Sequence, residues 1–251
     1  MQTPEHKPAE APDNSRYWLY GGIALLVIAL IYTAVLFIRA KAAAADPGAA
    51  LVANAANAPQ VQFVAAEDAV GESIGQPDAP VVVREFADYQ CPACAAFEPA
   101  LEKMRKDYVD TGMVRFVFFD YPLDIHKNAM QASLVARCAG AQGHFWPMHD
   151  LLYARQQEWA ELPDPLDKFQ SYAKEIGVDP AALLGCVRLG NTHEDVVRSQ
   201  GYGDAMGINA TPSYGVNGVG AAGIIPYEDL KKLIEQQYAL AKNPKAGAKK
   251  P

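Results

Sequence analysis

Hydrophobic positions are distributed unevenly along the chain, and the longest apolar run lies near the N-terminus. Trp18–Ile38 contains no charged residue. As a helix, this run would span roughly 31 Å, which matches the apolar core of a bilayer. We predict a transmembrane anchor at 17–38, preceded by a short cytoplasmic N-terminus at 1–16. A cleaved signal peptide is the alternative, because the small residues of Arg39–Ala45 could offer a cleavage site.

Small and polar residues dominate two further segments. Residues 39–60 are rich in Ala, with Asn, Pro and Gly and few large apolar side chains. Such a stretch buries too little surface to offset the entropy lost on ordering, so we predict a flexible linker, with partial helix as the alternative. Residues 242–251 are basic and contain Pro and Gly, which predicts a disordered tail. The segment 61–241 between them has the length of one domain with a sizeable core.

Short apolar runs at both ends of this domain predict the strands of a sheet. The predicted strands are Val61–Val64, Val81–Ala87, Val114–Phe119, Ser213–Val216 and Val219–Ala222. Asn217-Gly218 predicts the turn between the last two. A helix is predicted from Cys91 to about Val109, and another begins near Pro226.

Residues 125–206 lack strong strand signals, and their apolar spacing predicts several helices. The expected breaks are Gly140–Gly143, Leu162–Pro165 and Gly177–Pro180, where Gly and Pro gather. We therefore predict an α/β domain whose two parts, 61–124 and 207–241, are separated by a helical insertion.

Two cysteines stand at the junction between a predicted strand and a predicted helix. Cys91 and Cys94 are separated by Pro92 and Ala93, and thiols at this spacing can form and break a disulfide without moving the backbone. The unpaired N–H groups and the positive dipole end of the helix favour a thiolate at Cys91. Because the thiolate is the attacking form, the pattern predicts a redox centre. A structural disulfide within this motif is the alternative.

The other two cysteines stand alone and far apart. A zinc site would need four compactly spaced ligands, so we expect no metal, and no cofactor is implied. A bond between Cys138 and Cys186 would close a loop of about 49 residues, worth roughly 4 kcal/mol, with two free buried thiols as the alternative. An even number of cysteines fits an oxidising compartment, which predicts an extracytoplasmic domain.

Charge and the remaining motifs exclude some functions. The formal net charge is −7, which disfavours nucleic-acid binding. The sequence contains no internal repeat and no phosphate-binding loop. The aromatic segment His144–His149 is expected to pack within the insertion. His126 is expected on the surface, with a place near the redox motif as the alternative.

Three separated motifs carry a resemblance to a known family. They are Gly75–Pro80 (GQPDAP), Glu85–Cys94 (EFADYQCPAC) and Thr211–Gly218 (TPSYGVNG). Together they resemble the DsbA-like branch of the thioredoxin superfamily over about Val61–Ala241. The resemblance implies a thioredoxin fold with an inserted helical domain and a thiol:disulfide oxidoreductase activity. With the predicted anchor, it implies a single-pass protein of the bacterial inner membrane whose catalytic domain lies in the periplasm.

The resemblance also implies roles for individual residues. Cys91 would be the exposed nucleophile, and Cys94 the buried thiol that resolves mixed disulfides. Thr211 and Pro212 match a loop with a cis proline that binds an extended substrate chain, the alternative being an ordinary trans proline. Glu85 matches a buried acid of the family, and a carboxylate inside an apolar strand is costly unless it is used or paired. We expect it to relay a proton for Cys94, or else to be a satisfied structural acid.

Two prolines and one alanine bear on the shape of the predicted helix and on the direction of thiol–disulfide exchange. Pro99 lies eight residues after Cys91 and is expected to kink the helix. Pro92 and Ala93 tune the thiolate, and Ala93 supplies no positive charge where DsbA enzymes have histidine. The oxidising power is therefore expected to be weaker than in those enzymes.

Several functions fit these motifs. We predict disulfide formation in unfolded or reduced secreted proteins, with a reductase or isomerase of the same fold as the alternative. From a different class, a membrane-tethered chaperone or binding module with structural cysteines also fits. For an oxidase, the resemblance implies a quinone-linked reoxidant in the membrane, and we expect a monomer.

Overall fold

The computed structural model describes residues 30, 32, 33 and 62–243. Contacts divide the chain into one unit at residues 1–46 and another at 47–251. In the first unit, Leu30, Tyr32 and Thr33 are helical, and the Thr33 hydroxyl donates a hydrogen bond of 3.0 Å to the Leu30 carbonyl. Within the described residues, no helix has the length and apolar character needed to cross a bilayer. Apart from those three residues, the predicted N-terminus, anchor and linker (1–60) lie outside the described part.

The second unit is built on a five-stranded sheet with the order β1-β3-β2-β4-β5. The strands are β1 (Glu72–Ile74), β2 (Val81–Ala87), β3 (Val114–Asp120), β4 (Ser213–Val216) and β5 (Val219–Ala222). Only the β2–β3 pair is parallel in this sheet. Side chains of β2 and β3 are almost all buried, which explains their continuous apolar runs. Asn217 has a φ of 51° in the turn between β4 and β5, as a tight hairpin requires.

The first predicted strand is wrong. Residues 62–64 have no regular structure, a 3-10 helix η1 (Ala65–Val70) follows, and β1 begins only at Glu72. The Phe63 ring instead packs against Gly215 of β4. The contact is so close that a Cβ atom on residue 215 would lie 2.4 Å from ring atoms. The Arg84 guanidinium lies 4.8 Å from the centre of the same ring. The apolar side chain of Phe63 is thus partly buried without forming part of a strand.

Helices cover both faces of the sheet. On one face lie α3 (Pro92–Met104), which continues into a π-helical turn η2 (Arg105–Val109), and the C-terminal α10 (Tyr227–Lys242). Pro99 lies inside α3 without ending it. The predicted start of α10 is confirmed, and its end at Lys242 lies one residue into the predicted tail; residues 244–251 are outside the described part. The larger core fills this side of the sheet.

The opposite face is covered by α9 (His193–Ala205) and η1. A smaller apolar core forms there around the stacked rings of Phe86 and Phe119, with the ring of Tyr202 from α9 beside them. The last helix of the predicted insertion segment therefore packs on the sheet. Gly203 of α9 lies against the Tyr121 ring, and a Cβ atom at this position would be only 2.7 Å from ring atoms. The absence of a side chain at Gly203 therefore lets α9 pack close to the sheet.

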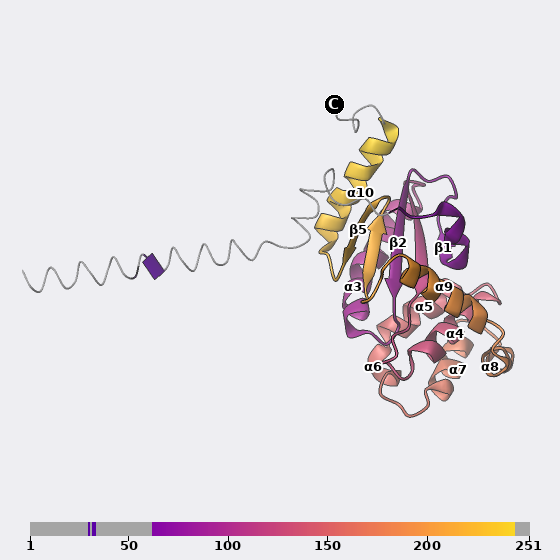
Figure 1. Ribbon diagram of the computed structural model, residues 1–251. Helices are drawn as coiled ribbons and strands as arrows, with labels where there is room; N and C mark the ends of the chain where they lie inside the picture. Colours follow the sequence, from indigo (N-terminus) through magenta and orange to yellow (C-terminus); the bar gives the residue numbers. More distant parts are fainter. Residues whose placement is uncertain (1–29, 31, 34–61, 244–251) are drawn as a thin grey trace, which may run out of the picture. The chain divides into compact units, whose positions relative to one another are not determined.

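The helices between β3 and α9 lie together beyond the C-terminal end of β2 (Figure 1). They are α4 (Ala129–Gly140), α5 (Phe145–Ala154), α6 (Gln156–Trp159), α7 (Leu166–Glu175) and α8 (Pro180–Leu189). The three predicted breaks are confirmed, and further breaks occur at Arg155 and at Gly190, whose φ is 65°. A buried ion pair of 2.7 Å between Arg137 Nε and Asp120 Oδ2 joins α4 to the end of β3.

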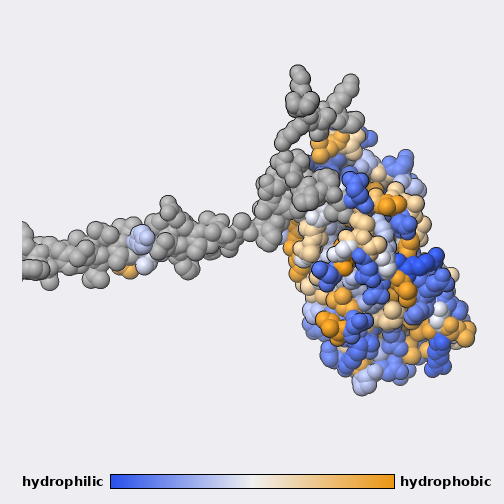
Figure 2. Space-filling view, viewed as in Figure 1, coloured by the Kyte–Doolittle hydropathy of each residue, from blue (hydrophilic) through white to orange (hydrophobic). Residues whose placement is uncertain are grey.

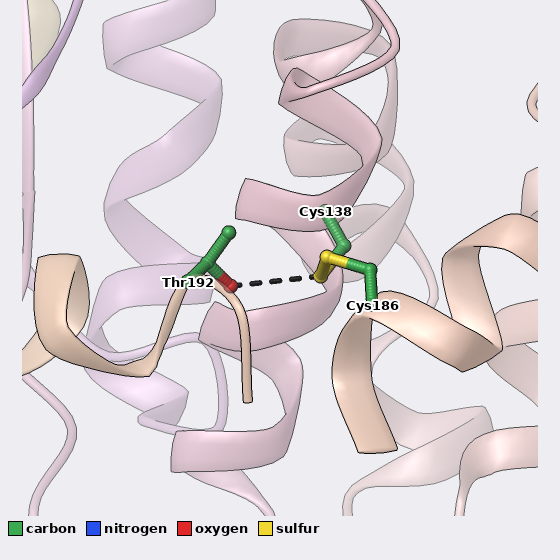
Figure 3. Close-up of a disulfide and its surroundings, with 3 residues drawn as sticks. All are labelled: Cys138, Cys186 and Thr192. Carbon is green, nitrogen blue, oxygen red and sulfur yellow. Dashed lines mark hydrogen bonds between the residues drawn. A yellow bond between two sulfur atoms is a disulfide. The ribbon is translucent and has the colours of Figure 1, made fainter. Parts of the chain in front are cut away.

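Cys138 of α4 and Cys186 of α8 are bonded to each other (Figure 3), with their Cα atoms 5.9 Å apart. Cys138 Sγ also lies 3.5 Å from the Thr192 hydroxyl oxygen. The bond ties the first helix of the insertion to the last one before α9. On the face of the domain seen in Figure 2, hydrophobic residues are scattered among hydrophilic ones, as is ordinary for a protein surface.

Candidate functional site

Cys91 occupies the turn between β2 and α3. It is the N-cap of α3, with extended backbone (φ −68°, ψ 121°), and Pro92 takes the first helical position. The Cys91 amide donates to the Asp88 carbonyl at 3.1 Å, and the Cys91 carbonyl accepts from the Ala95 amide at 3.2 Å. Proline suits this first position because its missing N–H would have no helical partner. The local sequence therefore places the Cys91 thiol at the amino end of a helix.

The two thiols differ in accessibility less than the sequence suggests. Cys91 is 6% exposed and Cys94 is 1% exposed, and both are free thiols. The expectation that Cys91 is exposed is therefore corrected, since the residues around the turn cover most of it. Cys91 is still the more accessible of the two sulfurs.

The two thiols also have opposite acidities. The hydrogen bond with the Cys94 thiol is the largest cause that lowers the pKa of Cys91 to about 5; contacts with Thr211 and with the backbone of Cys94 and Ala93 add to it, while burial opposes it. Burial raises the pKa of Cys94 far above its usual range, and the hydrogen bond to Cys91 and the Glu85 carboxylate act in the same direction. Near neutral pH, Cys91 is a thiolate and Cys94 a thiol.

The loop before β4 lies next to the Cys91 thiol. The Thr211–Pro212 peptide bond is cis, and the Thr211 carbonyl oxygen lies 3.5 Å from Cys91 Sγ. Pro212 is held in place where its carbonyl accepts a hydrogen bond of 2.7 Å from the Gly223 amide. These two residues are brought to the nucleophile from 120 positions away in the chain.

Glu85 lies inside the domain beneath α3. It is 1% exposed, and neither carboxylate oxygen has a hydrogen-bond partner within residues 62–243. Burial raises its pKa well above the usual range, and the charges of Glu98 and Cys91 act in the same direction against Arg105. Burial and nearby negative charge therefore favour the neutral form of this carboxyl group. The alternative of a hydrogen-bonded structural acid is not what the structure contains.

Asp88 anchors the turn that leads to Cys91. Its carboxylate accepts hydrogen bonds from the Gln90 amide at 2.7 Å, from the Leu123 amide at 2.9 Å and from His126 Nδ1 at 2.7 Å. Asp88 is fully buried, and the His126 side chain is 16% exposed. The expectation of a surface histidine is thus corrected in favour of a place next to the redox motif.

Three side-chain amides connect the same turn to the insertion. Gln90 Oε1 accepts from the Asn128 amide at 2.7 Å, and its Nε2 donates to the Ala160 carbonyl at 2.7 Å. Asn128 Nδ2 donates to the same carbonyl at 3.0 Å. Gln156 Nε2 donates to the carbonyls of Tyr89 at 2.7 Å and Cys91 at 3.0 Å. The insertion therefore helps to fix the backbone of the nucleophile.

A polar cluster, buried except for Asp150, lies between α3 and α5. Arg105 Nη2 is 2.7 Å from Glu98 Oε1 and 2.7 Å from Asp150 Oδ1, and His149 Nε2 is 3.4 Å from Glu98 Oε2. Tyr89 OH and His149 Nδ1 share a hydrogen bond of 3.0 Å. The His149, Glu98 and Asp150 side chains are close enough to hold a metal ion, but the Arg105 cation already pairs with both carboxylates.

The sequence alone predicted no contact between these surrounding residues. Asp88 and Gln90 stand within the EFADYQCPAC motif, and this motif was the signal available in the sequence. Their bonds to His126, Asn128 and Ala160 of the insertion have no signal in the local sequence. Glu98 and His149 stand 51 positions apart in sequence, so nothing in the local pattern joins them. His149 was expected to pack the insertion; it is fully buried among aromatic rings and is also the link between Tyr89 and Glu98.

A family model described as thioredoxin matches residues 67–236. The chain therefore belongs to the thioredoxin family. Among solved structures, the thioredoxin-family domain is similar to oxidised BdbD from Bacillus subtilis, with a TM-score of 0.63, 26% identity, and coverage of 72% of this chain and 97% of the other. It also shares its fold with alpha-DsbA1 from Wolbachia pipientis, with a TM-score of 0.62, 22% identity, and coverage of 68% and 92%.

The curated relatives include a disulfide bond formation protein and several Na(+)/H(+) antiporters. Disulfide bond formation protein D of Bacillus subtilis is 29% identical over 171 residues, covering 65% of this chain and 75% of the relative. The Na(+)/H(+) antiporter NhaA 3 of Salinispora tropica is 34% identical over 182 residues, covering 70% of this chain. The chain spans only about a quarter (26%) of that antiporter's length. Together with the family match, these similarities support an oxidoreductase enzyme of the thioredoxin family with DsbA-like relatives.

Proposed function

We propose that this protein catalyses thiol–disulfide exchange through Cys91 and Cys94. The observation that carries the proposal is the opposite acidity of the two thiols, with the pKa of Cys91 lowered to about 5 and that of Cys94 raised by burial. A thiolate at Cys91 attacks a disulfide or leaves from one, and Cys94 resolves the mixed disulfide. The similarity to a relative named disulfide bond formation protein D supports this chemistry.

The direction that these acidities favour is disulfide formation. A low thiolate pKa stabilises the reduced enzyme, which makes its disulfide more oxidising. The value of about 5 for Cys91 falls between the roughly 3.5 of DsbA and the roughly 7 of thioredoxin. This agrees with the weaker oxidant expected from the uncharged Ala93, and it leaves a reductase or isomerase as the competing assignment.

The substrates proposed are unfolded or reduced secreted proteins. The Thr211 carbonyl lies at the Cys91 sulfur, so an extended chain bound along residues 211–213 would carry its own sulfur to the nucleophile. Main-chain pairing of this kind accepts many sequences, which suits an enzyme that acts on diverse reduced chains. A chaperone or binding module with only structural cysteines would not require a thiolate at this position.

The location proposed follows from the N-terminal sequence and not from the described residues. An anchor at 17–38 would hold the domain, through the linker at 39–60, on the periplasmic side of a bacterial inner membrane. There, a quinone-linked membrane protein would reoxidise the Cys91–Cys94 pair, and the protein would act as a monomer. A periplasm-dependent reporter fused to the C-terminus should be active, and an inactive fusion would reverse the topology.

Two measurements test the proposed activity. Full-length protein should oxidise a reduced model substrate, and the Cys91→Ser variant should have no activity above the uncatalysed rate; residual catalysis in that variant would contradict the assignment. The reduction potential of the pair against glutathione then gives the direction. A value near the roughly −120 mV of DsbA would support an oxidase, and one near the roughly −270 mV of thioredoxin a reductase.

A further inference from the structure

The Cys91 turn lies between two loops that adjoin the neighbouring strands of the sheet. β2 pairs with the antiparallel β4 on one side and with the parallel β3 on the other. The start of β4 and the end of β3 therefore both lie next to the end of β2, where the turn begins. The start of β4 brings the Thr211 carbonyl to Cys91 Sγ. The end of β3 brings the segment 121–128 to the other side of the turn.

Hydrogen bonds fix this segment against the turn at several points. The Asp88 carboxylate accepts from the Leu123 amide at 2.9 Å and from His126 Nδ1 at 2.7 Å. Two residues further along the turn, Gln90 Oε1 accepts from the Asn128 amide at 2.7 Å. The two segments therefore run side by side, and the His126 ring belongs to the wall of the turn that presents the nucleophile.

The contact with Asp88 determines which nitrogen of His126 is basic. Asp88 is fully buried, and its other carboxylate oxygen accepts from the Gln90 amide at 2.7 Å, so the carboxylate is fixed in position. A carboxylate can only accept a hydrogen bond, which means that Nδ1 carries the hydrogen in this contact. In the neutral ring, Nε2 is then the nitrogen with the free electron pair. A histidine that acts as a general base needs such an oriented ring.

Nε2 is also the nitrogen that an incoming molecule can reach. The His126 side chain is 16% exposed, whereas the Asp88 side chain against Nδ1 is fully buried. The exposed edge of the ring is therefore the edge that faces away from Asp88. Within residues 62–243, no group forms a hydrogen bond with Nε2. The basic nitrogen is thus free to bind a proton donor from outside the protein.

Ionisable groups border His126 from the turn, from its own segment and from the insertion. In the turn, Asp88 is in direct contact with the ring, and Cys91 follows three residues later. Asp124 and Lys127 are exposed neighbours in the segment, and Lys127 Nζ lies 3.7 Å from a carboxylate oxygen of Glu161. In the disulfide form of the enzyme, Cys91 carries no charge. Asp88 is then the charged group that acts most directly on the ring.

We propose that His126 is the general base for the substrate cysteine, taking its proton at Nε2 as the substrate sulfur attacks Cys91 of the enzyme disulfide. This proposal rests on the exchange activity proposed above and names the group that activates the incoming thiol. An ordinary cysteine has a pKa of roughly 8.5, so near neutral pH most substrate thiols arrive protonated. Histidine is the side chain suited to accept and return a proton in this range. Asp88 is the positioning residue that holds the ring.

The proposed step conserves protons and electrons. The substrate thiol gives its proton to His126 Nε2, and its sulfur forms the new bond to Cys91 Sγ. The bond between Cys91 and Cys94 breaks, and Cys94 keeps the electron pair as a thiolate. A second substrate thiol then attacks the first substrate sulfur, and Cys91 leaves as a thiolate. The substrate loses two electrons to the enzyme disulfide; of its two protons, one ends on Cys94 and the other passes to water.

Attack by a small thiol on the enzyme disulfide tests the proposal. Oxidised full-length protein is mixed with reduced glutathione, and the free thiols formed at Cys91 and Cys94 are trapped with a maleimide and measured by peptide mass spectrometry. At about pH 6, glutathione is protonated and a base assists its attack. At about pH 10, it is a thiolate and needs no base. The rate at the higher pH therefore reports the site without the contribution of His126.

Two substitutions of His126 separate a base from a positioning residue. His126→Asn keeps an N–H donor where Nδ1 meets Asp88 but has no basic nitrogen, and His126→Ala removes both. At pH 6, His126→Asn should slow the reaction about tenfold, less than the roughly 10²–10⁴ of acid–base catalysis because the ionised fraction of glutathione reacts without help. His126→Ala should slow it at least as much. At pH 10, His126→Asn should react like the unaltered protein.

A matched control and the contrary outcomes complete the test. His193→Asn makes the same substitution at an exposed position of α9 and should change neither rate. A normal rate for His126→Asn at pH 6 would overturn the proposal and leave His126 as a positioning residue. Equal slowing of His126→Asn at both pH values would also overturn it, because a disturbed turn acts at any pH. If the disulfide of the unaltered protein reacts no faster than that of oxidised glutathione, the proposed exchange activity fails instead.

Discussion

Two cysteine pairs in the same domain have opposite chemistry. Cys91 and Cys94 are free thiols separated by two residues at the start of α3, next to a carbonyl from a distant loop. Cys138 and Cys186 are separated by 48 positions and are bonded between two helices of the insertion. Cys91, Cys94 and Cys138 are buried and Cys186 is partly buried, so burial does not explain the difference between the pairs. The difference lies in what surrounds each sulfur.

The surroundings of the first pair stabilise a charge. Backbone groups at the helix start, the neighbouring thiol and the Thr211 loop favour a thiolate at Cys91. The second pair has no such arrangement within the described residues, and its bond restrains two helices that are far apart in sequence. The low thiol pKa of Cys91 therefore comes from the groups in the turn that surround its sulfur. The number of cysteines in the domain does not explain it.

Removing the partner thiol should have the largest effect on the first pair. In Cys94→Ala, turnover should be lost and a mixed disulfide at Cys91 should accumulate, visible by mass spectrometry. The pKa of Cys91 should also rise above about 5, because the hydrogen bond from Cys94 is the main cause of its low value. Cys94→Ser keeps a hydroxyl donor and should raise that pKa less. Equal pKa values in the two variants would show that this hydrogen bond is not the main cause.

Removing the second pair should change stability and not chemistry. The double variant Cys138→Ser/Cys186→Ser should lower the free energy of unfolding by about 4 kcal/mol, since the bond restricts the unfolded chain over a long loop. Urea unfolding measures this loss. The rate of the Cys91 reaction at neutral pH should stay within about twofold of the unaltered rate. A large fall in that rate for the folded variant would mean that the two pairs are not independent.

Glu85→Gln should change how the stability of the domain and the reaction of Cys94 depend on pH. A raised folded pKa contributes stability that is present below the unfolded value near 4.5 and is lost as pH rises through the folded value. At neutral pH, Glu85 therefore costs stability, and the variant should be more stable by an amount on the order of 1 kcal/mol, with little difference near pH 4. The Cys94-dependent step should become less dependent on pH. Equal stability curves across this range would remove the basis for the raised pKa.

The smallest change expected concerns the contact between the insertion and the nucleophile. Gln156→Ala removes two hydrogen bonds to the carbonyls of Tyr89 and Cys91. It should lower stability by about 1 kcal/mol and slow the Cys91 reaction two- to threefold, as expected for hydrogen bonds that only hold a backbone in place. Gln157→Ala, at an exposed neighbouring position, is the matched control. If both variants behave alike, the insertion does not support Cys91.

The parts of the fold that could be predicted are those whose sequence pattern is local. Val81–Ala87 and the hairpin strands around Asn217 were predicted with the bounds that the structure has, because buried apolar runs and a turn signal mark them. The strand predicted at Val61–Val64 was wrong because the edge strand forms at Glu72–Ile74, through pairing with β3. Backbone pairing of a short edge strand leaves little trace in its own side chains.

The site divides in the same way. The cysteines, Glu85 and the Thr211–Pro212 loop were predicted from motifs. The bonds from Asp88 to His126 and from Gln156 to Cys91 were not, because each joins the first part of the domain to a residue of the insertion. The accessibility of Cys91 was misjudged for the same reason, since a helix start is exposed only until other elements cover it.

The hydrogen bonds made by Asp88, Gln90 and Gln156 have a consequence for how such proteins diversify. They hold the active-site turn by groups outside the pair Pro92 and Ala93. Substitutions at Ala93 can therefore retune the electron affinity of the disulfide while the shape of the turn is kept. For the proposed exchange activity, a change at Ala93 would alter the charge next to Cys91 and leave in place the side chains that hold the turn.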